Sequence, residues 1–196
     1  MRRIGFALAA VPLMLLMTVG SAAADTSPNG TNFFSFASSC STQGSRQVCS
    51  DMYLSVSSNE DGSDGPPCLE VFTYSIGANG RQSVISDEFG CATSGTMTVG
   101  TDLSVTVPAS QITLDSCGRR TCTTSRTVTV SASDTPTSPI STTTSRSTTK
   151  SGGCTTRTTT TDTFADLAGT MTIDGTSFDQ TGSIDVFTSS STTHCK

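Results

Sequence analysis

Chemically versatile side chains are scarce in this sequence. Its 196 residues include no Trp, two Tyr and a single histidine, His194, which stands next to Cys195 near the C-terminus. A Ser-His-Asp triad needs a histidine that packing holds in place, and chain ends are usually mobile. The G-x-S-x-G motif is also absent. We therefore expect no serine-hydrolase triad, and the lack of Trp leaves little to stack against sugar rings.

Positive charge is limited as well. The chain has 11 Lys and Arg against 16 Asp and Glu, which gives a net charge of −5 at pH 7. Beyond the first 24 residues, two basic residues stand together only at Arg119 and Arg120. Because neutralising phosphates requires clustered cations, we expect no nucleic-acid partner and no attraction to anionic membranes.

The first 24 residues resemble a secretion signal. Arg2 and Arg3 precede an apolar run at 4–20, and Ala22 to Ala24 supply the small residues that a signal peptidase needs. The alternative is a transmembrane anchor, but Pro12 interrupts the run and small residues end it. We therefore predict that residues 1–24 are a signal peptide that is removed. Residues 25–196 are then a single secreted, extracellular domain without a membrane anchor.

The cysteines are the strongest structural signal. An even number in an exported chain predicts disulfides, which would stabilise a domain that is poor in large apolar residues. Sequence cannot choose among the 105 possible connectivities of eight cysteines, and our prediction pairs neighbours in the chain. A zinc site is the alternative, but no C-x-x-C occurs. The predicted pairs are Cys40 with Cys49, Cys68 with Cys91, Cys117 with Cys122, and Cys154 with Cys195.

Apolar residues recur with a period of two, which is typical of β-strands with one buried face. No segment after residue 24 has the pattern of a helix, and turn signals such as Asn79-Gly80 and Asp174-Gly175 separate the apolar segments. Many short strands with such turns predict an all-β, single-domain antiparallel β-sandwich, or a barrel-like sheet, stapled by disulfides. The expected strands are 48–56, 69–76, 83–89, 95–99, 103–107, 111–116, 127–132, 167–173 and 183–188.

The Ser/Thr-rich stretch at 140–164 has three interpretations. Its composition fits a mucin-like stalk or a flexible linker. However, Thr favours strands, and Lys150 to Gly153 stand midway as a turn. The apolar residues that follow also need to return to a shared core. We therefore predict a polar hairpin of 140–149 with 154–164.

Candidates for chemistry are weak. In the acidic loop at 57–68, Asn59, Asp61 and Asp64 have the alternation of a calcium loop, but position twelve is Cys68 in place of Glu, and a solvated loop is the alternative. Ser147 and Lys150 match S-x-x-K by chance, without S-D-N or K-T-G. A glycosidase needs two converging carboxylates, and nothing favours a pair such as Asp87 and Glu88 over a solvated turn. We expect no cofactor.

The segment 121–125 reads T-C-T-T-S and resembles the opening of the repeat of beetle antifreeze proteins. In those proteins, stacked Thr-x-Thr rows form a flat ice-binding face, and the unit recurs about every twelve residues with a second Cys. Here the match covers one unit, and Val128 occupies the place of the second Cys.

Together these features predict a secreted binding or structural module without catalysis, acting on an extracellular ligand or surface. Two alternatives remain open: a secreted hydrolase that uses a carboxylate pair, and a Thr-array protein that binds ice or another surface.

Overall fold

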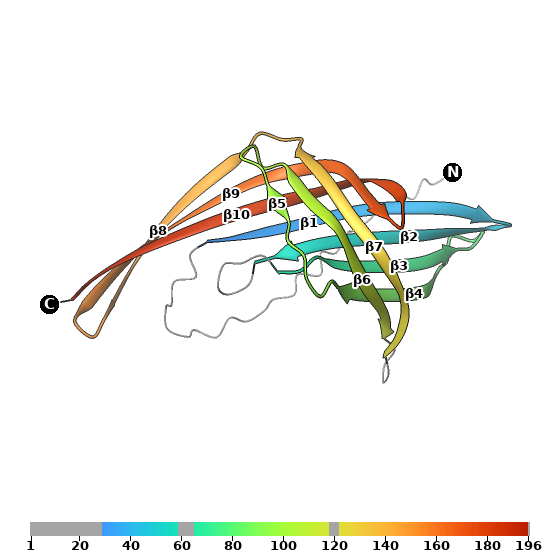
Figure 1. Cartoon of the computed structure of the whole chain (residues 1–196), viewed down its shortest axis with the longest axis horizontal. Helices are drawn as coiled ribbons and strands as arrows, with labels where there is room; N and C mark the ends of the chain where they lie inside the picture. The colour runs from blue at the N-terminus through green and yellow to red at the C-terminus, as the bar shows by residue number, and fades with distance from the viewer. Residues whose placement is uncertain (1–28, 59–64, 118–121, 196) are drawn as a thin grey trace, which may run out of the picture.

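The computed structural model describes residues 29–58, 65–117 and 122–195 (Figure 1). The predicted signal peptide and the calcium candidates Asn59, Asp61 and Asp64 lie outside these residues. Within them the chain is all-β and antiparallel and contains no helix, which confirms the predicted fold class.

Ten strands follow one another along the chain. They are β1 (Asn29–Gln43), β2 (Arg46–Ser57), β3 (Cys68–Ile76), β4 (Gln82–Cys91), β5 (Thr98–Val99), β6 (Val105–Cys117), β7 (Cys122–Pro136), β8 (Ser141–Ser151), β9 (Cys154–Ile173) and β10 (Thr176–Cys195).

The strands form one sheet whose hydrogen bonds close into a ring. The order is β10-β1-β2-β3-β4-β6-β7-β9, and β9 pairs with β10 to complete the circle. Of the two predicted layouts, this is the barrel-like one. The seam between β4 and β6 is short, because only Glu88↔Ser116 and Phe89↔Asp115 are paired there, with one further bridge between Ala92 and Ile112.

Buried and outward-facing side chains alternate along each strand, and the buried ones form the core inside the ring. Val128 and Met171, for example, are 1% and 0% exposed, whereas the Thr residues on either side of them face outward or are only half-buried. The Thr-x-Thr segments around these two residues are therefore ordinary half-buried strands. The largest fully buried side chains are Phe33, Leu54, Leu69, Ile112, Leu114, Leu167, Met171 and Ile184.

Two sequence predictions about strands were wrong. No strand was expected before residue 48, yet β1 is a strand of the ring and pairs with both β10 and β2. Its pattern is hidden because Phe34 and Phe36 point outward while the small residues Ser35 and Ala37 are buried.

The expected strands 103–107 and 111–116 are a single strand, β6, whose pairing shifts between Val107 and Ser110.

The predicted polar hairpin is present. β8 pairs with β9 from Ser141↔Phe164 to Ser151↔Cys154, and the turn is made by Gly152 and Gly153, with φ of 57° and 80°. This left-handed backbone is what a two-residue hairpin turn requires. The Ser/Thr-rich stretch is therefore ordered β-structure.

The hairpin does not lie in the ring, however. Together with the end of β10 it forms a three-stranded arm, which we define as residues 143–162 and 187–195 (Figure 1). None of its described residues belongs to the buried core cluster. The arm is thus an extension of the sheet, with both faces open to solvent.

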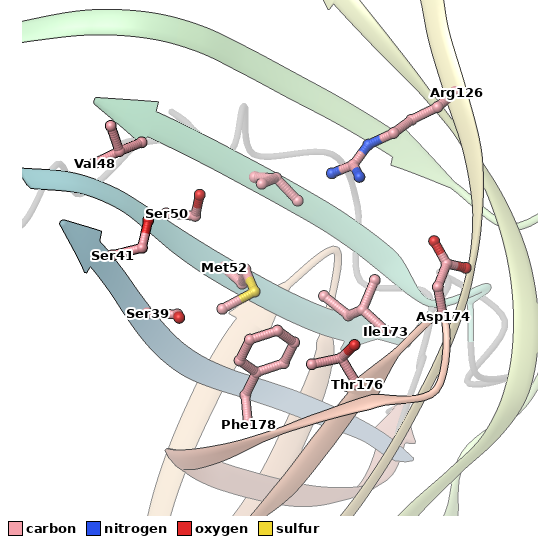
Figure 2. A pocket seen from close by; sticks show the side chains of 11 residues that line it. Ser39, Ser41, Val48, Ser50, Met52, Arg126, Ile173, Asp174, Thr176 and Phe178 are labelled. Atoms are coloured by element: carbon pink, nitrogen blue, oxygen red, sulfur yellow. The ribbon is translucent and has the colours of Figure 1, made fainter. Parts of the chain in front are cut away.

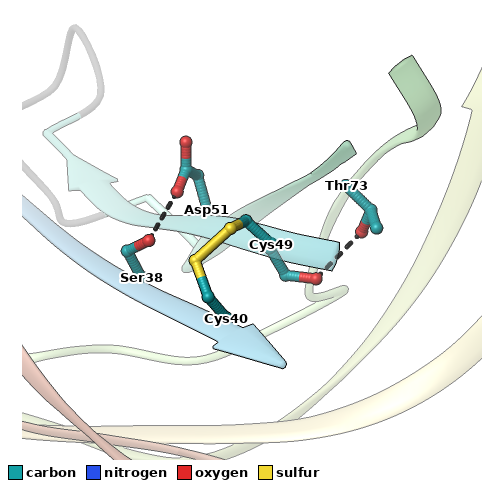
Figure 3. The surroundings of a disulfide bond; sticks show 6 residues. Ser38, Cys40, Cys49, Asp51 and Thr73 are labelled. Carbon is teal, nitrogen blue, oxygen red and sulfur yellow. Dashed lines mark hydrogen bonds between the residues drawn. A yellow bond between two sulfur atoms is a disulfide. The ribbon is translucent and has the colours of Figure 1, made fainter. Parts of the chain in front are cut away.

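Three disulfides join residues that stand opposite each other on neighbouring strands: Cys40–Cys49, Cys68–Cys91 and Cys154–Cys195. Figure 3 shows the first of them, beside the Ser38–Asp51 hydrogen bond of 2.7 Å. For the fourth predicted pair, the backbones of Cys117 and Cys122 are paired, but their side chains lie outside the described residues. The three bridges are consistent with an oxidising compartment.

Candidate binding surfaces

The interior of the ring opens at one end into a pocket of about 340 Å³. Its lining residues come from β1, β2, β3, β7, β9, β10 and the turn between the last two strands (Figure 2). The floor is apolar, with Met52, Val71, Ile173 and Phe178, and the rim carries the hydroxyls of Ser39, Ser41, Ser50 and Thr176 and the carboxylate of Asp174.

The pocket exists because the inward-facing side chains of β1 change along the strand. Near the middle they are Phe33, Ser35 and Ala37, which are buried, whereas Ser39 and Ser41 follow on the same face and are exposed. Small polar side chains leave space where large apolar ones would have continued the core.

Arg126 is the one cation among the described residues that line this pocket. Its Nε donates to Glu88 Oε2 at 3.3 Å, and the side chain of Arg126 is 50% exposed while that of Glu88 is 14% exposed. Figure 2 shows the guanidinium directed over the pocket. A guanidinium has five N–H donors, so the ion pair leaves terminal donors for a ligand.

A second surface lies on the outer wall of the ring, where aromatic and acidic side chains alternate. In the register of the sheet, Phe36 stands beside Tyr53, then Glu70, then Phe89, and in the next row Asp51 stands beside Phe72, then Asp87. The ring centres of Phe36 and Tyr53 are 5.1 Å apart, and those of Phe72 and Tyr74 are 5.8 Å apart. We call this set the acidic-aromatic face: Phe36, Asp51, Tyr53, Glu70, Phe72, Tyr74, Asp87, Phe89 and Asp115.

The potential over the acidic-aromatic face is negative. Partial burial, and then the carboxylate of Asp87, raise the pKa of Glu70. Burial raises the pKa of Tyr53 as well, and the nearby charges of Asp51 and Glu70 add to this effect. A hollow of about 540 Å³ lies between Glu70, Asp87, Phe89 and Asp115. One buried carboxylate oxygen of Asp115 has no hydrogen-bond partner among the described residues.

The arm has two chemically different faces. Successive side chains of a strand point to opposite sides, so the register assigns every arm residue to one of them. The first face carries three rows of hydroxyls, and we call it the hydroxyl face: Ser145-Thr160-Ser189, Ser147-Thr158-Ser191 and Thr149-Thr156-Thr193. The opposite side, the basic face, carries Arg146, Lys150, Arg157 and His194.

The catalytic candidates of the sequence are not brought together. Asp87 and Glu88 are neighbours in β4 and therefore point to opposite sides of the wall, and they do not form a solvated turn. Ser147 and Lys150 lie on different faces of the arm. His194 is at the tip of the arm. Among the described residues, no group of three His, Cys, Asp or Glu side chains is arranged to hold a metal ion.

A polar pair is buried inside the ring. Gln180 Nε2 donates to Asp134 Oδ2 at 2.6 Å, and the two residues are 3% and 1% exposed. They meet across Gly169, which is paired with both, and a Cβ at this glycine would collide with the backbone oxygen of Ser133 and lie 2.7 Å from Asp134 Oδ1. Burial raises the pKa of Asp134 to about 6, and the hydrogen bond from Gln180 lowers it only in part.

Comparisons with known proteins add no relationship. The chain matches no protein-family model, and no curated protein or solved structure shows significant similarity to it. The part of the chain that the structure describes has no helix with the length and hydrophobicity of a membrane span.

Sequence reasoning missed the surfaces that the fold creates. Nothing in the sequence around Arg126 marks it as part of a pocket, because its neighbours in the pocket come from distant strands. The two faces of the arm were in principle readable, since the basic residues at 146, 150 and 157 would share one face once the hairpin register around Gly152 and Gly153 was known.

Proposed function

We propose that this protein is a secreted, extracellular binding module that acts without a cofactor and holds a small amphipathic anion in the pocket at the open end of the ring. The observation that carries this proposal is the combination of an apolar floor with Arg126 at the rim. Ligand sites of this size are usually concave, largely apolar and oriented by a few polar groups, and mouths of closed β-structures are a common location. The signal-like N-terminus and the disulfides support the extracellular setting.

The pocket can be tested with 8-anilinonaphthalene-1-sulfonate, a fluorescent amphipathic anion, and octanoate as its competitor. We expect saturable fluorescence enhancement that octanoate reverses. Arg126→Gln should weaken binding by about tenfold, because a charge-assisted hydrogen bond is lost. Ser39→Trp should abolish binding by filling the pocket.

The matched control is Arg146→Gln, which removes the same charge from the arm. It should bind the probe like the wild type. Equal affinity in the wild type, Arg126→Gln and Ser39→Trp would place the probe elsewhere and refute the proposal.

A second candidate is attachment to an ordered surface, for which ice is the case we propose. It is favoured by the hydroxyl face, where nine Ser and Thr side chains form three uncharged rows. Neighbouring strands are about 4.8 Å apart and alternate residues about 6.8 Å apart, so the hydroxyls recur at regular intervals along and across the three strands. We do not propose hydrolysis, because Asp87 and Glu88 point to opposite sides of β4.

This candidate predicts that the protein slows ice recrystallisation. Thr158→Lys should eliminate the effect, since a long charged side chain in the central row prevents flat contact. Thr159→Lys makes the same replacement on the basic face and should leave the effect intact. Recrystallisation rates followed by microscopy would reject the candidate if both variants behaved alike.

A further inference from the structure

We propose that two copies of this chain associate head to tail, with the basic face of one arm docked on the acidic-aromatic face of the next molecule. The inference rests on two surfaces that lie on different parts of the chain and have opposite charge. This association does not depend on the ligand proposed for the pocket.

The acceptor surface is acidic and lacks compensating cations. Asp51, Glu70, Asp87 and Asp115 come from four different strands, β2, β3, β4 and β6. Among the described residues, each basic side chain lies elsewhere: Arg46 and Arg81 near the ends of strands, Arg126 at the pocket, and the others on the arm. Burial raises the pKa of Tyr53 and that of Tyr74, and the charge of Asp51 adds to the rise in both cases.

The donor surface has the opposite character. Arg146, Lys150 and Arg157 share one side of the arm, and in the described arm strands this side carries no Asp or Glu. Asp162 lies on the other side, near the base. A positive strip on one side of a Thr-rich ribbon is suited to charge-guided docking.

The two surfaces also match in scale. Arg146 and Lys150 are four residues apart in β8, or about 14 Å, and Arg157 lies between them on β9, opposite Thr148. On the acceptor, Asp51 and Asp87 are separated by one strand, or about 10 Å, and Glu70 is one row away. Three cations can therefore face three carboxylates at once.

Aromatic rings strengthen the fit. Phe89 is 54% exposed, and Phe36, Tyr53, Phe72 and Tyr74 lie in the same outer wall. Guanidinium groups stack on aromatic faces while hydrogen-bonding to neighbouring carboxylates, which Lys does less well. The alternation of rings and carboxylates thus suits Arg146 and Arg157 in particular.

The arm does not reach the acidic-aromatic face of its own molecule, because β8, β9 and β10 extend away from β2, β3 and β4, which carry most of that face (Figure 1). The contact is therefore between molecules and uses two different patches. Such a heterologous contact leaves one free arm and one free face at the ends of every dimer, so it continues into longer chains or closed rings.

The test is sedimentation velocity of the whole secreted protein over a range of concentrations. We expect concentration-dependent association at about 0.05 M salt that weakens strongly at about 0.5 M, since exposed charges are screened. Arg146→Glu combined with Arg157→Glu should weaken association by about 100-fold or more. Ser147→Glu combined with Thr158→Glu adds negative charge to the hydroxyl face of the same arm and should change association little.

A charge-swap experiment identifies the partner surface. Asp51→Arg combined with Asp87→Arg should also prevent association alone, but mixing this variant with the arm variant Arg146→Glu/Arg157→Glu should restore heterodimers. Circular dichroism verifies that each variant is folded. A chain that stays monomeric at low salt, or arm and face variants that associate like the wild type, would overturn the proposal. Binding of an oligo-arginine peptide by a purely monomeric chain would likewise overturn it, by assigning the face to another basic partner.

Discussion

Replacing Asp134 by Asn is expected to stabilise the protein at neutral pH by about 3 kcal/mol. Burial raises the pKa of Asp134 from 3.8 to about 6, and each pKa unit corresponds to about 1.4 kcal/mol. Between these values the folded protein holds a proton that the unfolded chain has released. The free energy of unfolding therefore falls as the pH rises from about 4 to about 6, and it remains low above that range. Asn has nearly the same shape as Asp but cannot ionise, so the free energy of unfolding of the variant does not show this fall.

Urea unfolding at several pH values between about 3.5 and 7.5 measures the effect. Wild type and Asp134→Asn should be similar at the acidic end and diverge towards neutrality. The control, Asp179→Asn, changes an exposed aspartate and should retain the wild-type fall. If Asp134→Asn differed from the wild type by the same amount at every pH, Asp134 would not be the cause of the fall, and the prediction would be wrong.

Removing the disulfide at the tip of the arm is expected to have an effect of similar size. Cys154 and Cys195 are 41 residues apart in sequence, and the chain-entropy model assigns such a loop about 4 kcal/mol of stabilisation. The described arm residues contribute nothing to the buried core, so the bridge holds together strands that have little apolar packing. The double variant Cys154→Ser/Cys195→Ser should lose up to this amount of unfolding free energy, and amides of the arm should exchange faster than those of the ring.

A matched comparison is Cys68→Ser/Cys91→Ser, which opens a loop of 23 residues between β3 and β4. Chain entropy predicts a loss of about 3 kcal/mol there, with faster exchange in the ring and an unchanged arm. Hydrogen exchange followed by mass spectrometry separates the two patterns. Equal acceleration throughout the protein in both variants would show that arm and ring unfold as one unit.

The cysteine pairs illustrate why part of the fold could be predicted. Where strands follow one another as hairpins, residues close in sequence become partners in space, so pairing neighbouring cysteines matched all three disulfides of the described residues. The same logic produced the hairpin around Gly152 and Gly153. It failed for β1, whose partner β10 begins more than a hundred residues later in the chain, and whose outward Phe34 and Phe36 concealed its buried face.

The candidate surfaces were less predictable, because each depends on several strands. Arg126 belongs to the pocket only because the fold brings the first part of β7 close to residues of β1, β2 and the turn after β9. Asp134 and Gln180 are separated by 46 residues and meet because Gly169 leaves space between them. A sequence pattern reports the surroundings of a residue along its own strand, whereas these contacts run across strands.

From the sequence alone came the all-β class, most strand positions, the turns and the polar hairpin, because alternation, β-branching and glycine act over a few residues. Only the tertiary structure decided that the sheet closes into a ring, that the Thr-rich hairpin projects from it as an arm, and which charged side chains share a surface. These features depend on the register between strands that are far apart in the chain, and on closure of the sheet upon itself, which no local pattern encodes.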